Sequence, residues 1–415
     1  MNLRRIDDVL HVDDVPLTEL ARFAGTPVYV YSWKSILNRL KQFEESFSGI
    51  KHQTFFAVKA NSNLAILRRL ANCGCGFDVV SGGELERVLR AGGNPSSIVF
   101  SGVGKSEEEL SFALKCDIGC INLESVSEYK NLVRTATTLN VRANVAIRTN
   151  PEVDTGTHPY IATALETSKF GVTTRDALDL AKRIVKDDVL NLDGIACHLG
   201  SQISDIAPYE SALTTMLGLV ERLDEVGISL SHLNIGGGFG IRYAQESELQ
   251  LDSLAKELAT HLAGRDLTLG LEPGRFLVGP SGLLLSTVHY TKIDEQEKYP
   301  NFAIVDAAMN DLLRPALYDA HHEIEVVETS ESETRTWNVV GPICESGDFL
   351  GLDRKLALAE GDLLAIHDVG AYGFVLSSNY NSRTRCAEVL VDGSDVHIIR
   401  SRETMDDLLR LERFA

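Results

Sequence analysis

The feature that most constrains the fold of this chain is a regular alternation of short apolar runs with segments of helical periodicity over about the first 280 residues. Each apolar run is long enough for a strand and too short for a helix. The runs cover residues 54–60, 76–81, 97–102, 119–125, 144–150, 192–199, 231–236 and 267–272. The expected helices between them cover residues 64–71, 84–91, 107–115, 127–139, 175–186, 209–226 and 249–263. Consecutive strand–helix repeats of this number predict a TIM-type (β/α)8 barrel rather than an open sheet.

The alternation ends near residue 280, and the rest of the chain is typical of an antiparallel β-domain. Strand-like runs separated by turns cover residues 283–291, 302–306, 323–327, 336–340, 363–368, 388–391 and 396–400. Two apolar alternations, at 9–12 and 28–31, precede the barrel, and we expect this opening segment to fold onto the carboxy-terminal domain. The predicted fold class is therefore α/β plus all-β, with a barrel over 30–280 and a β-domain built from 1–29 and 281–415.

Charge and cysteine usage exclude several function classes. The formal net charge of −19 disfavours nucleic acid and anionic membranes as partners. The sequence contains no secretory signal and no apolar stretch long enough to span a bilayer, so we expect a cytoplasmic protein. The cysteines form neither a CxxC pair nor a zinc-ligand spacing, which predicts no metal and no disulfide. Six of them are expected to be small buried residues, namely Cys73, Cys75, Cys116, Cys120, Cys197 and Cys386.

Lys59 carries the strongest chemical signal. It follows Phe55-Phe56-Ala57-Val58, a run that is apolar on both faces, as in a parallel sheet covered by helices. Its amine would then project into a sheltered mouth, where desolvation favours the neutral, nucleophilic form that reacts with carbonyl groups. A solvated surface lysine is the alternative interpretation.

Three other predicted strands also end in unusual motifs, at the barrel end where chemistry gathers. They are His198-Leu199-Gly200-Ser201-Gln202, Gly236-Gly237-Gly238-Phe239-Gly240 and Glu272-Pro273-Gly274-Arg275. The glycine run suits bare backbone amides that approach a phosphate, although a tight bend explains it equally well. Arg275 has a planar guanidinium group, which can bind a phosphate or a carboxylate through two hydrogen bonds. Glu272 is suited to face a pyridine nitrogen, or else to pair with an arginine or cap a helix.

A reactive lysine, a phosphate cradle and a carboxylate together predict pyridoxal 5'-phosphate (PLP) as cofactor. On these motifs the chain resembles the diaminopimelate decarboxylase branch of the alanine-racemase-like, fold-type III family of PLP enzymes. The strings that carry the resemblance over the whole chain are Phe56-Ala57-Val58-Lys59-Ala60-Asn61, His158-Pro159-Tyr160-Ile161, His198-Leu199-Gly200-Ser201-Gln202-Ile203, Asn234-Ile235-Gly236-Gly237-Gly238-Phe239-Gly240, Glu272-Pro273-Gly274-Arg275, Arg314-Pro315-Ala316-Leu317-Tyr318, Cys344-Glu345-Ser346-Gly347-Asp348 and Gly370-Ala371-Tyr372-Gly373.

The resemblance implies cofactor roles for most of these residues. Lys59 would hold PLP covalently, Glu272 would pair with the pyridine nitrogen, and His198 would lie against the ring. The other residues expected near the phosphate or the cofactor face are Ser201, Gly236, Gly237, Gly238, Phe239, Gly240, Pro273, Gly274, Arg275 and Tyr372. An isolated His198 packed in the core, or a Tyr372 that only packs in its turn, is the alternative.

The resemblance also implies a substrate, a reaction and an assembly. The substrate would be meso-2,6-diaminopimelate, decarboxylated to L-lysine and carbon dioxide as the last step of lysine biosynthesis. Arg275, Arg314, Tyr318 and Tyr372 would bind its distal end, since two guanidinium groups suit a carboxylate that ornithine and lysine lack at that end. An exposed helical turn is the alternative for Arg314 and Tyr318.

Two further residues would complete the site from a second subunit of a homodimer. Glu345 would bind the distal ammonium, and Cys344, expected to be a buried thiol, would reprotonate the α-carbon. A structural thiol is the alternative for Cys344. At the level of function, a PLP decarboxylase of another basic substrate (D-lysine, D-ornithine or carboxynorspermidine) and a non-catalytic PLP-binding homologue remain open.

Overall fold

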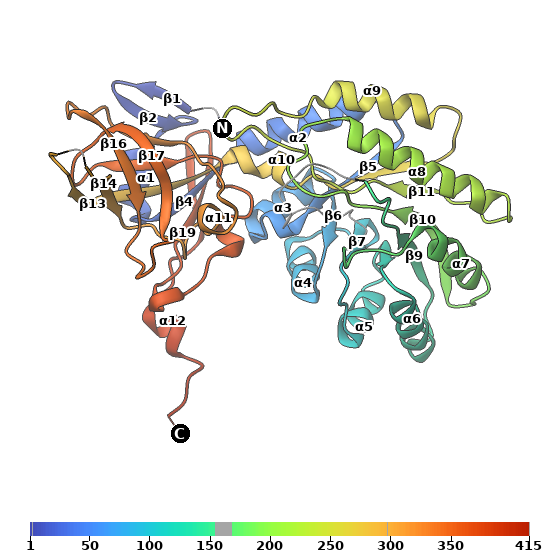
Figure 1. Cartoon of the computed structure of the whole chain (residues 1–415). Coiled ribbons are helices and arrows are strands. Elements are labelled where there is room, and N and C mark those ends of the chain that lie inside the picture. The colour runs from blue at the N-terminus through green and yellow to red at the C-terminus, as the bar shows by residue number, and fades with distance from the viewer. Residues whose placement is uncertain (2, 154–167, 297, 415) are drawn as a thin grey trace. The chain divides into compact units, whose positions relative to one another are not determined.

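The computed structural model describes residues 1, 3–153, 168–296 and 298–414, and the chain divides into two compact units (Figure 1). The first unit comprises Met1–Leu40, Arg242–Glu246 and Leu277–Ala415, and the second comprises Lys41–Ile241 and Ser247–Phe276. No helix in the described part of the chain is long and apolar enough to cross a membrane.

The second unit is a closed barrel of eight parallel strands, which confirms the predicted fold class (Figure 1). The strands follow one another around the barrel in chain order, and β12 pairs with β5 to close it. They are β5 His52–Ala57, β6 Gly76–Val79, β7 Ile98–Phe100, β8 Cys120–Leu123, β9 Ala143–Arg148, β10 Leu190–Ala196, β11 His232–Asn234 and β12 Thr268–Leu271. All eight predicted strands are therefore present, each shifted by a few residues at its ends.

Helices lie before, between and after these strands. They are α2 Trp33–Phe47, α3 Leu64–Asn72, α4 Gly82–Ala91, α5 Glu107–Lys115, α6 Val126–Leu139, α7 Thr174–Ile184, α8 Ala207–Asp224, α9 Leu251–Leu262 and α10 Arg275–Val278. The side chains of Ser81, Ser106 and Ser125 accept hydrogen bonds from backbone amides in the first turns of α4, α5 and α6. Such caps satisfy amides that have no partner within the helix, and so they define where α4, α5 and α6 begin.

The first unit is built mainly from antiparallel strands in the order β17-β16-β14-β13-β4-β19-β20, with β18 joining β13 to β15. The bounds are β4 Val28–Ser32, β13 Gly282–Lys292, β14 Asn301–Val305, β15 Ile324–Val326, β16 Thr334–Val340, β17 Phe349–Ala357, β18 Leu363–Ile366, β19 Ala387–Asp392 and β20 Asp395–Arg400. Two pairings, β4 with β19 and β14 with β16, are parallel. Strand β17 has no counterpart among the predicted runs, because its exposed centre is polar and breaks the apolar alternation.

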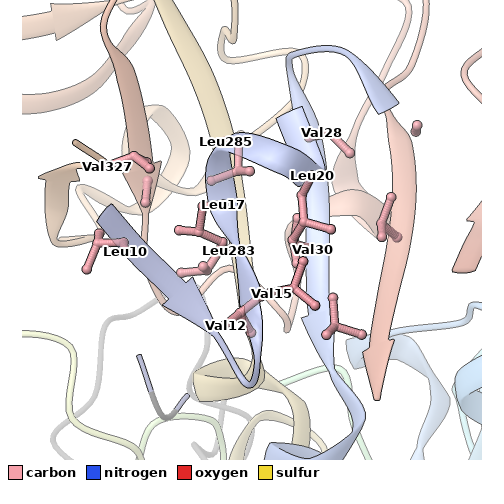
Figure 2. Packing of buried hydrophobic residues seen from close by; sticks show 14 residues of the cluster. Leu10, Val12, Val15, Leu17, Leu20, Val28, Val30, Leu283, Leu285 and Val327 are labelled. Atoms are coloured by element: carbon pink, nitrogen blue, oxygen red, sulfur yellow. The ribbon is translucent and has the colours of Figure 1, made fainter. Parts of the chain in front are cut away.

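The opening segment of the chain contributes to the core of this unit (Figure 2). It forms β1 Leu3–Ile6, β2 Val9–Val12, β3 Val15–Pro16 and α1 Leu17–Ala24, and the unit also contains α11 Arg314–Tyr318 and α12 Met405–Leu409. Leu17 and Leu20 of α1 are buried in one cluster with Leu283 and Leu285 of β13. Burial of each such side chain contributes about 1.5–3 kcal/mol, which anchors the opening segment to the central strands.

The cysteine prediction holds for only three of the six residues. Cys75, Cys197 and Cys386 are buried, Cys116 and Cys120 are half-buried, and Cys73 is exposed. Cys73 and Cys116 are the C-cap residues of α3 and α5, where the chain leaves the helix at the surface. Position at a helix end therefore outweighs the general preference of cysteine for the interior.

Candidate active site

Lys59 lies in a short turn at the carboxyl end of β5. Strand β5 ends at Ala57, so Lys59 lies beyond the strand. Residues Val58–Ala60 form one turn of 3-10 helix. The Lys59 ammonium donates a 2.7 Å hydrogen bond to Oδ2 of Asp78, and its side chain keeps 31% of its exposure while Asp78 is fully buried. The amine of Lys59 is therefore accessible rather than desolvated as we expected, and the buried carboxylate of Asp78 holds it in place.

Asp78 is a residue that the sequence-based prediction missed. It lies in β6, opposite Ala57 in the strand register, so its side chain shares the barrel interior with the end of β5. Its Oδ1 is buried and has no hydrogen-bond partner among the described residues. The available signal was a single acid inside the apolar strand Gly76–Val79, because a buried charge is rarely kept without a partner or a function.

Glu272 directly follows β12 and is held from two sides. Its backbone amide donates to the carbonyl of Gly236 at 2.8 Å, and Nδ2 of Asn234 donates to its Oε1 at 2.9 Å. Burial and the nearby Asp78 carboxylate raise the pKa of Glu272 to about 8, against the opposing effect of Lys59. Near neutral pH this carboxyl group can therefore exchange a proton with a basic nitrogen.

His198 is a neutral ring in this site. Its Nδ1 accepts a 3.1 Å hydrogen bond from the amide of Gly237, so that nitrogen carries no proton. Burial, with further contributions from Lys59 and Arg148, holds the pKa of His198 well below its usual range. Its Nδ1 lies 3.9 Å from Oε2 of Glu272, but a neutral imidazole makes no ion pair there. The ring is suited to stacking rather than to charge.

The glycine run is required by the packing of the loops around it. A Cβ atom on Gly237 would lie 2.1 Å from the carbonyl oxygen of Glu272, and one on Gly238 would lie 2.6 Å from that of Gly200. Gly236 and Gly238 also have φ values of +74° and +90°, in the region that favours glycine. The tight-bend interpretation is therefore correct for these positions, since larger residues would separate three strand-end loops.

The same run also leaves donors for an anion. The amide of Gly236 donates to Asn234, that of Gly237 to His198, and that of Gly240 to the carbonyl of Ile203. The amides of Gly238 and Phe239, in contrast, donate to no described residue. Because the Phe239 ring is buried and stacks on Tyr209 with centroids 5.6 Å apart, these two amides are held in place.

The motif from Glu272 to Arg275 is tied to the turn that carries Lys59. The amide of Ala57 donates to the carbonyl of Pro273 at 3.1 Å, and a Cβ on Gly274 would lie 3.0 Å from the Cβ atoms of Ala57 and Ala60. Arg275 is 8% exposed, and its Nη2 donates to Oγ of Ser201 at 2.7 Å. The tertiary structure thus brings together the motifs after β5, β10, β11 and β12.

A second buried network, also missed in the sequence, lies after β8 and β9. Arg148 Nη1 pairs with Oε1 of Glu124 at 2.8 Å, and Lys105 pairs with Glu128 at 2.7 Å. The signal for Arg148 was its place at the end of the apolar strand β9. Its charge acts on both His198 and Glu272, because it lowers the pKa of each.

The barrel residues fit PLP by the chemistry of their donors. An accessible primary amine, a carboxyl group that titrates near neutrality and a flat neutral ring suit an aldehyde on a pyridine ring. The two fixed amides and the Ser201 hydroxyl suit a phosphate.

Arg314 of the first unit is buried, which excludes the exposed helical turn as its environment. It is 6% exposed at the start of α11, where Pro315 follows at a position that tolerates proline. Its Nη1 lies 2.9 Å from Nε2 of His322, and its guanidinium carbon lies 4.6 Å from the centre of the Tyr243 ring. Tyr318, at the other end of the helix, is half-buried.

Cys344 is exposed in the single chain, and its burial in a site shared with a second subunit stays a prediction. The Asp348 carboxylate accepts hydrogen bonds from the amides of Met309 and Ile343 at 2.6 and 2.7 Å, and this shapes the loop that displays the thiol. The Cys344 thiol donates to Oδ1 of Asn381 at 3.3 Å. A structural role in the core is excluded for this cysteine.

Two further predicted residues lie in the same unit. Glu345 accepts a hydrogen bond from the hydroxyl of Tyr380, and this contact raises the pKa of Tyr380. Tyr372 is half-buried with a φ of +56°, uncommon for a tyrosine. The string 158–161 lies outside the described residues.

Comparisons with known proteins agree with this geometry. Residues 33–279 match the model of the pyridoxal-dependent decarboxylases, specifically their pyridoxal-binding domain. The diaminopimelate decarboxylase of Pseudomonas aeruginosa is 49% identical over 402 residues, which cover 97% of this chain and 96% of that protein.

Solved structures give the same result. The diaminopimelate decarboxylase of Helicobacter pylori complexed with L-lysine superimposes with a TM-score of 0.91 at 41% identity, covering 95% of this chain and 98% of that one. The enzyme from M. jannaschii, also complexed with L-lysine, superimposes with a TM-score of 0.94 at 36% identity, covering 100% and 98%. With its barrel, its lysine–carboxylate site and full-length relatives of one name, the chain belongs to the diaminopimelate decarboxylase family of pyridoxal-dependent decarboxylases.

Proposed function

We propose that this chain decarboxylates meso-2,6-diaminopimelate to L-lysine and carbon dioxide, the last step of lysine biosynthesis, with PLP as cofactor. The observation that carries the proposal is the barrel mouth, where the amine of Lys59 is held by Asp78 and where Glu272 titrates near neutral pH. Bound PLP supplies an electron sink for the pair that the departing carboxylate leaves behind.

The residues of the barrel are assigned to cofactor binding and proton control. Lys59 would hold the cofactor covalently, and Asp78 would keep its amine in place through their hydrogen bond. Glu272, oriented by Asn234, shares a proton with the pyridine nitrogen and so favours its cationic form. The flat, neutral ring of His198 would lie against the cofactor ring.

The phosphate is assigned to the glycine-run loop. The amides of Gly238 and Phe239 and the hydroxyl of Ser201 donate to it, while Gly236, Gly237 and Gly240 use their own amides to hold the loop. Pro273, Gly274 and Tyr372 complete the surroundings of the cofactor.

The distal end of the substrate is assigned to charged groups of matching sign. Arg275 and Arg314, each a buried guanidinium, bind its carboxylate, with Tyr318 and Tyr372 nearby. Glu345 binds its ammonium. A substrate without a distal carboxylate would place no negative charge beside these buried guanidinium groups, which disfavours it.

Steady-state rates decide between this substrate and its rivals. We expect kcat/KM for meso-diaminopimelate to exceed that for D-lysine, D-ornithine or carboxynorspermidine by at least about 100-fold, because a site built to bind a charged group rejects analogues that lack it. Preference for a substrate without the distal carboxylate would remove the roles given to Arg275 and Arg314. No turnover of any of them by the PLP-loaded protein would favour the non-catalytic homologue.

The assembly that we propose is a homodimer in which Cys344 and Glu345 serve the active site of the partner subunit. The exposure of Cys344 in the single chain supports this, since a proton donor for decarboxylation must be shielded from water in the working enzyme. A cytoplasmic location belongs to the same proposal, because a chain with only unpaired thiols suits a reducing compartment.

Hybrid dimers test the shared site. Neither Lys59→Ala nor Cys344→Ala homodimers should retain more than a small fraction of the activity, whereas a mixed population should recover up to about one quarter of it, since one of two sites is intact in the half that are hybrids. The assay follows carbon dioxide release after the two chains are unfolded and refolded together, with differently tagged chains to confirm that hybrids form. Confirmed hybrids without recovered activity would show that each chain builds its own site.

A further inference from the structure

We propose that His322, together with Tyr243, fixes the guanidinium of Arg314 in the orientation that binds the distal carboxylate of the substrate. This inference rests on the proposed function, and it adds two positioning residues to it. All three side chains belong to the first unit, and each has its own fixed contact with the other two.

The hydrogen bonds of His322 determine the state of its ring. The residue is fully buried, and its Nδ1 lies 2.7 Å from the carbonyl oxygen of His367, so Nδ1 must carry a proton. Its Nε2 lies 2.9 Å from Nη1 of Arg314, and a guanidinium only donates, so Nε2 must present a lone pair. The ring is therefore a neutral acceptor aimed at the arginine.

Tyr243 fixes the remaining freedom of the guanidinium. Its ring centre lies 4.6 Å from the guanidinium carbon of Arg314, within the range of a cation–π contact. The same ring meets that of His322 edge to face, with centroids 5.4 Å apart and an interplanar angle of 81°. The hydrogen bond from Nη1 to His322 and the contact with the Tyr243 ring together restrict the direction and the tilt of the Arg314 guanidinium plane. A bidentate contact with a carboxylate depends on that alignment.

The local sequence explains why these residues meet. Helix α11 ends at Asp319, a C-cap with φ of +52° in the left-handed region, and the chain turns back so that His322 reaches Arg314. Tyr243 stands three residues after Gly240, so the segment that follows the glycine run also ends against the arginine.

The neighbouring His321 provides a matched control. Its side chain is 33% exposed and its Nδ1 lies 3.0 Å from Nη1 of Arg354. His321→Asn removes a histidine from the same turn without removing the acceptor of Arg314.

Two substitutions of His322 separate the acceptor from the bulk of the ring. In His322→Asn the amide can replace the Nδ1 donor to His367 but is too short to reach Arg314, whereas in His322→Gln the longer side chain can present an oxygen near the position of Nε2. We expect His322→Asn to raise KM for meso-diaminopimelate about tenfold or more, the scale of a hydrogen bond to a charged group, with kcat changed less than about threefold. His322→Gln should recover most of that loss.

Binding of L-lysine provides a readout besides turnover, because the product keeps the distal carboxylate. Its dissociation constant, measured by titration calorimetry on the PLP-loaded protein, should rise in His322→Asn by the same factor as KM, and His321→Asn should leave it within about twofold of the wild type. A merely structural role would instead lower kcat and the melting temperature along with affinity.

Tyr243 supplies an independent test if His322→Asn does not fold. Tyr243→Phe keeps the ring under the guanidinium, and Tyr243→Leu removes it, so only the second should weaken L-lysine binding, by about threefold or more. Wild-type protein without activity on meso-diaminopimelate would overturn the proposed function itself. Active wild type, with folded His322→Asn or Tyr243→Leu proteins that bind L-lysine normally, would overturn the positioning role alone.

Discussion

Lys59→Ala is expected to abolish covalent binding of PLP and to lower kcat for meso-diaminopimelate by at least about 10³-fold, because the amine both holds the cofactor and takes part in proton transfer. Reduction of the PLP-loaded protein with borohydride, followed by peptide mass spectrometry, should find the cofactor on Lys59 in the wild type and nowhere in the variant. The absorbance of the bound cofactor above 400 nm should change in parallel.

Lys51→Ala is the matched control for this experiment. Lys51 also pairs with an aspartate, Asp266, at 2.8 Å, but its side chain is 63% exposed on the surface of the barrel. Loss of a surface ion pair has a small effect on stability, so this variant should keep the cofactor label and the activity. A wild-type protein whose Lys59 peptide stays unmodified after reduction would contradict the assignment of the site.

Glu272→Gln is expected to lower kcat by about 10²- to 10⁴-fold, the range of a lost proton-transfer or charge-stabilising group. An amide of the same size keeps the acceptor for Asn234 but does not hold a negative charge opposite the pyridine nitrogen, so the electron sink is weakened. Glu225→Gln, at the exposed end of α8, removes a carboxylate far from the chemistry and serves as the control. Activity of Glu272→Gln within about threefold of the wild type would contradict this role.

The same substitution predicts a change in the pH dependence of stability of the cofactor-free protein. The pKa of Glu272 is raised from 4.5 to about 8, so between these values the folded protein holds a proton that the unfolded chain has released. Stability therefore falls as pH rises through this window, by up to about 1.4 kcal/mol per pH unit. Melting temperatures at pH 5 and pH 8 should differ less in Glu272→Gln than in the wild type. Some dependence should remain, since burial also raises the pKa of Glu84 to about 7.

Most of the barrel was predictable because its signals are local. An apolar run of strand length followed by a segment of helical periodicity is visible along the chain, and all eight barrel strands follow from this alternation. The motifs at the strand ends were also found in this way, since a parallel barrel gathers those ends at one rim. Strand β17 was missed because its polar centre hides the same signal.

The partners of the site residues followed only from the tertiary structure. Asp78 meets Lys59 from 19 positions away, and Asn234 meets Glu272 from 38. Burial, with Lys59 nearby, makes His198 neutral, and burial, with Asp78 nearby, moves the titration of Glu272 towards neutral pH. The sequence alone thus determined the architecture and the location of the chemistry, because periodicity and caps act along the chain. Which groups pair, and which carry a proton, depends on distances through space and on access of water, and these exist only once the barrel has closed.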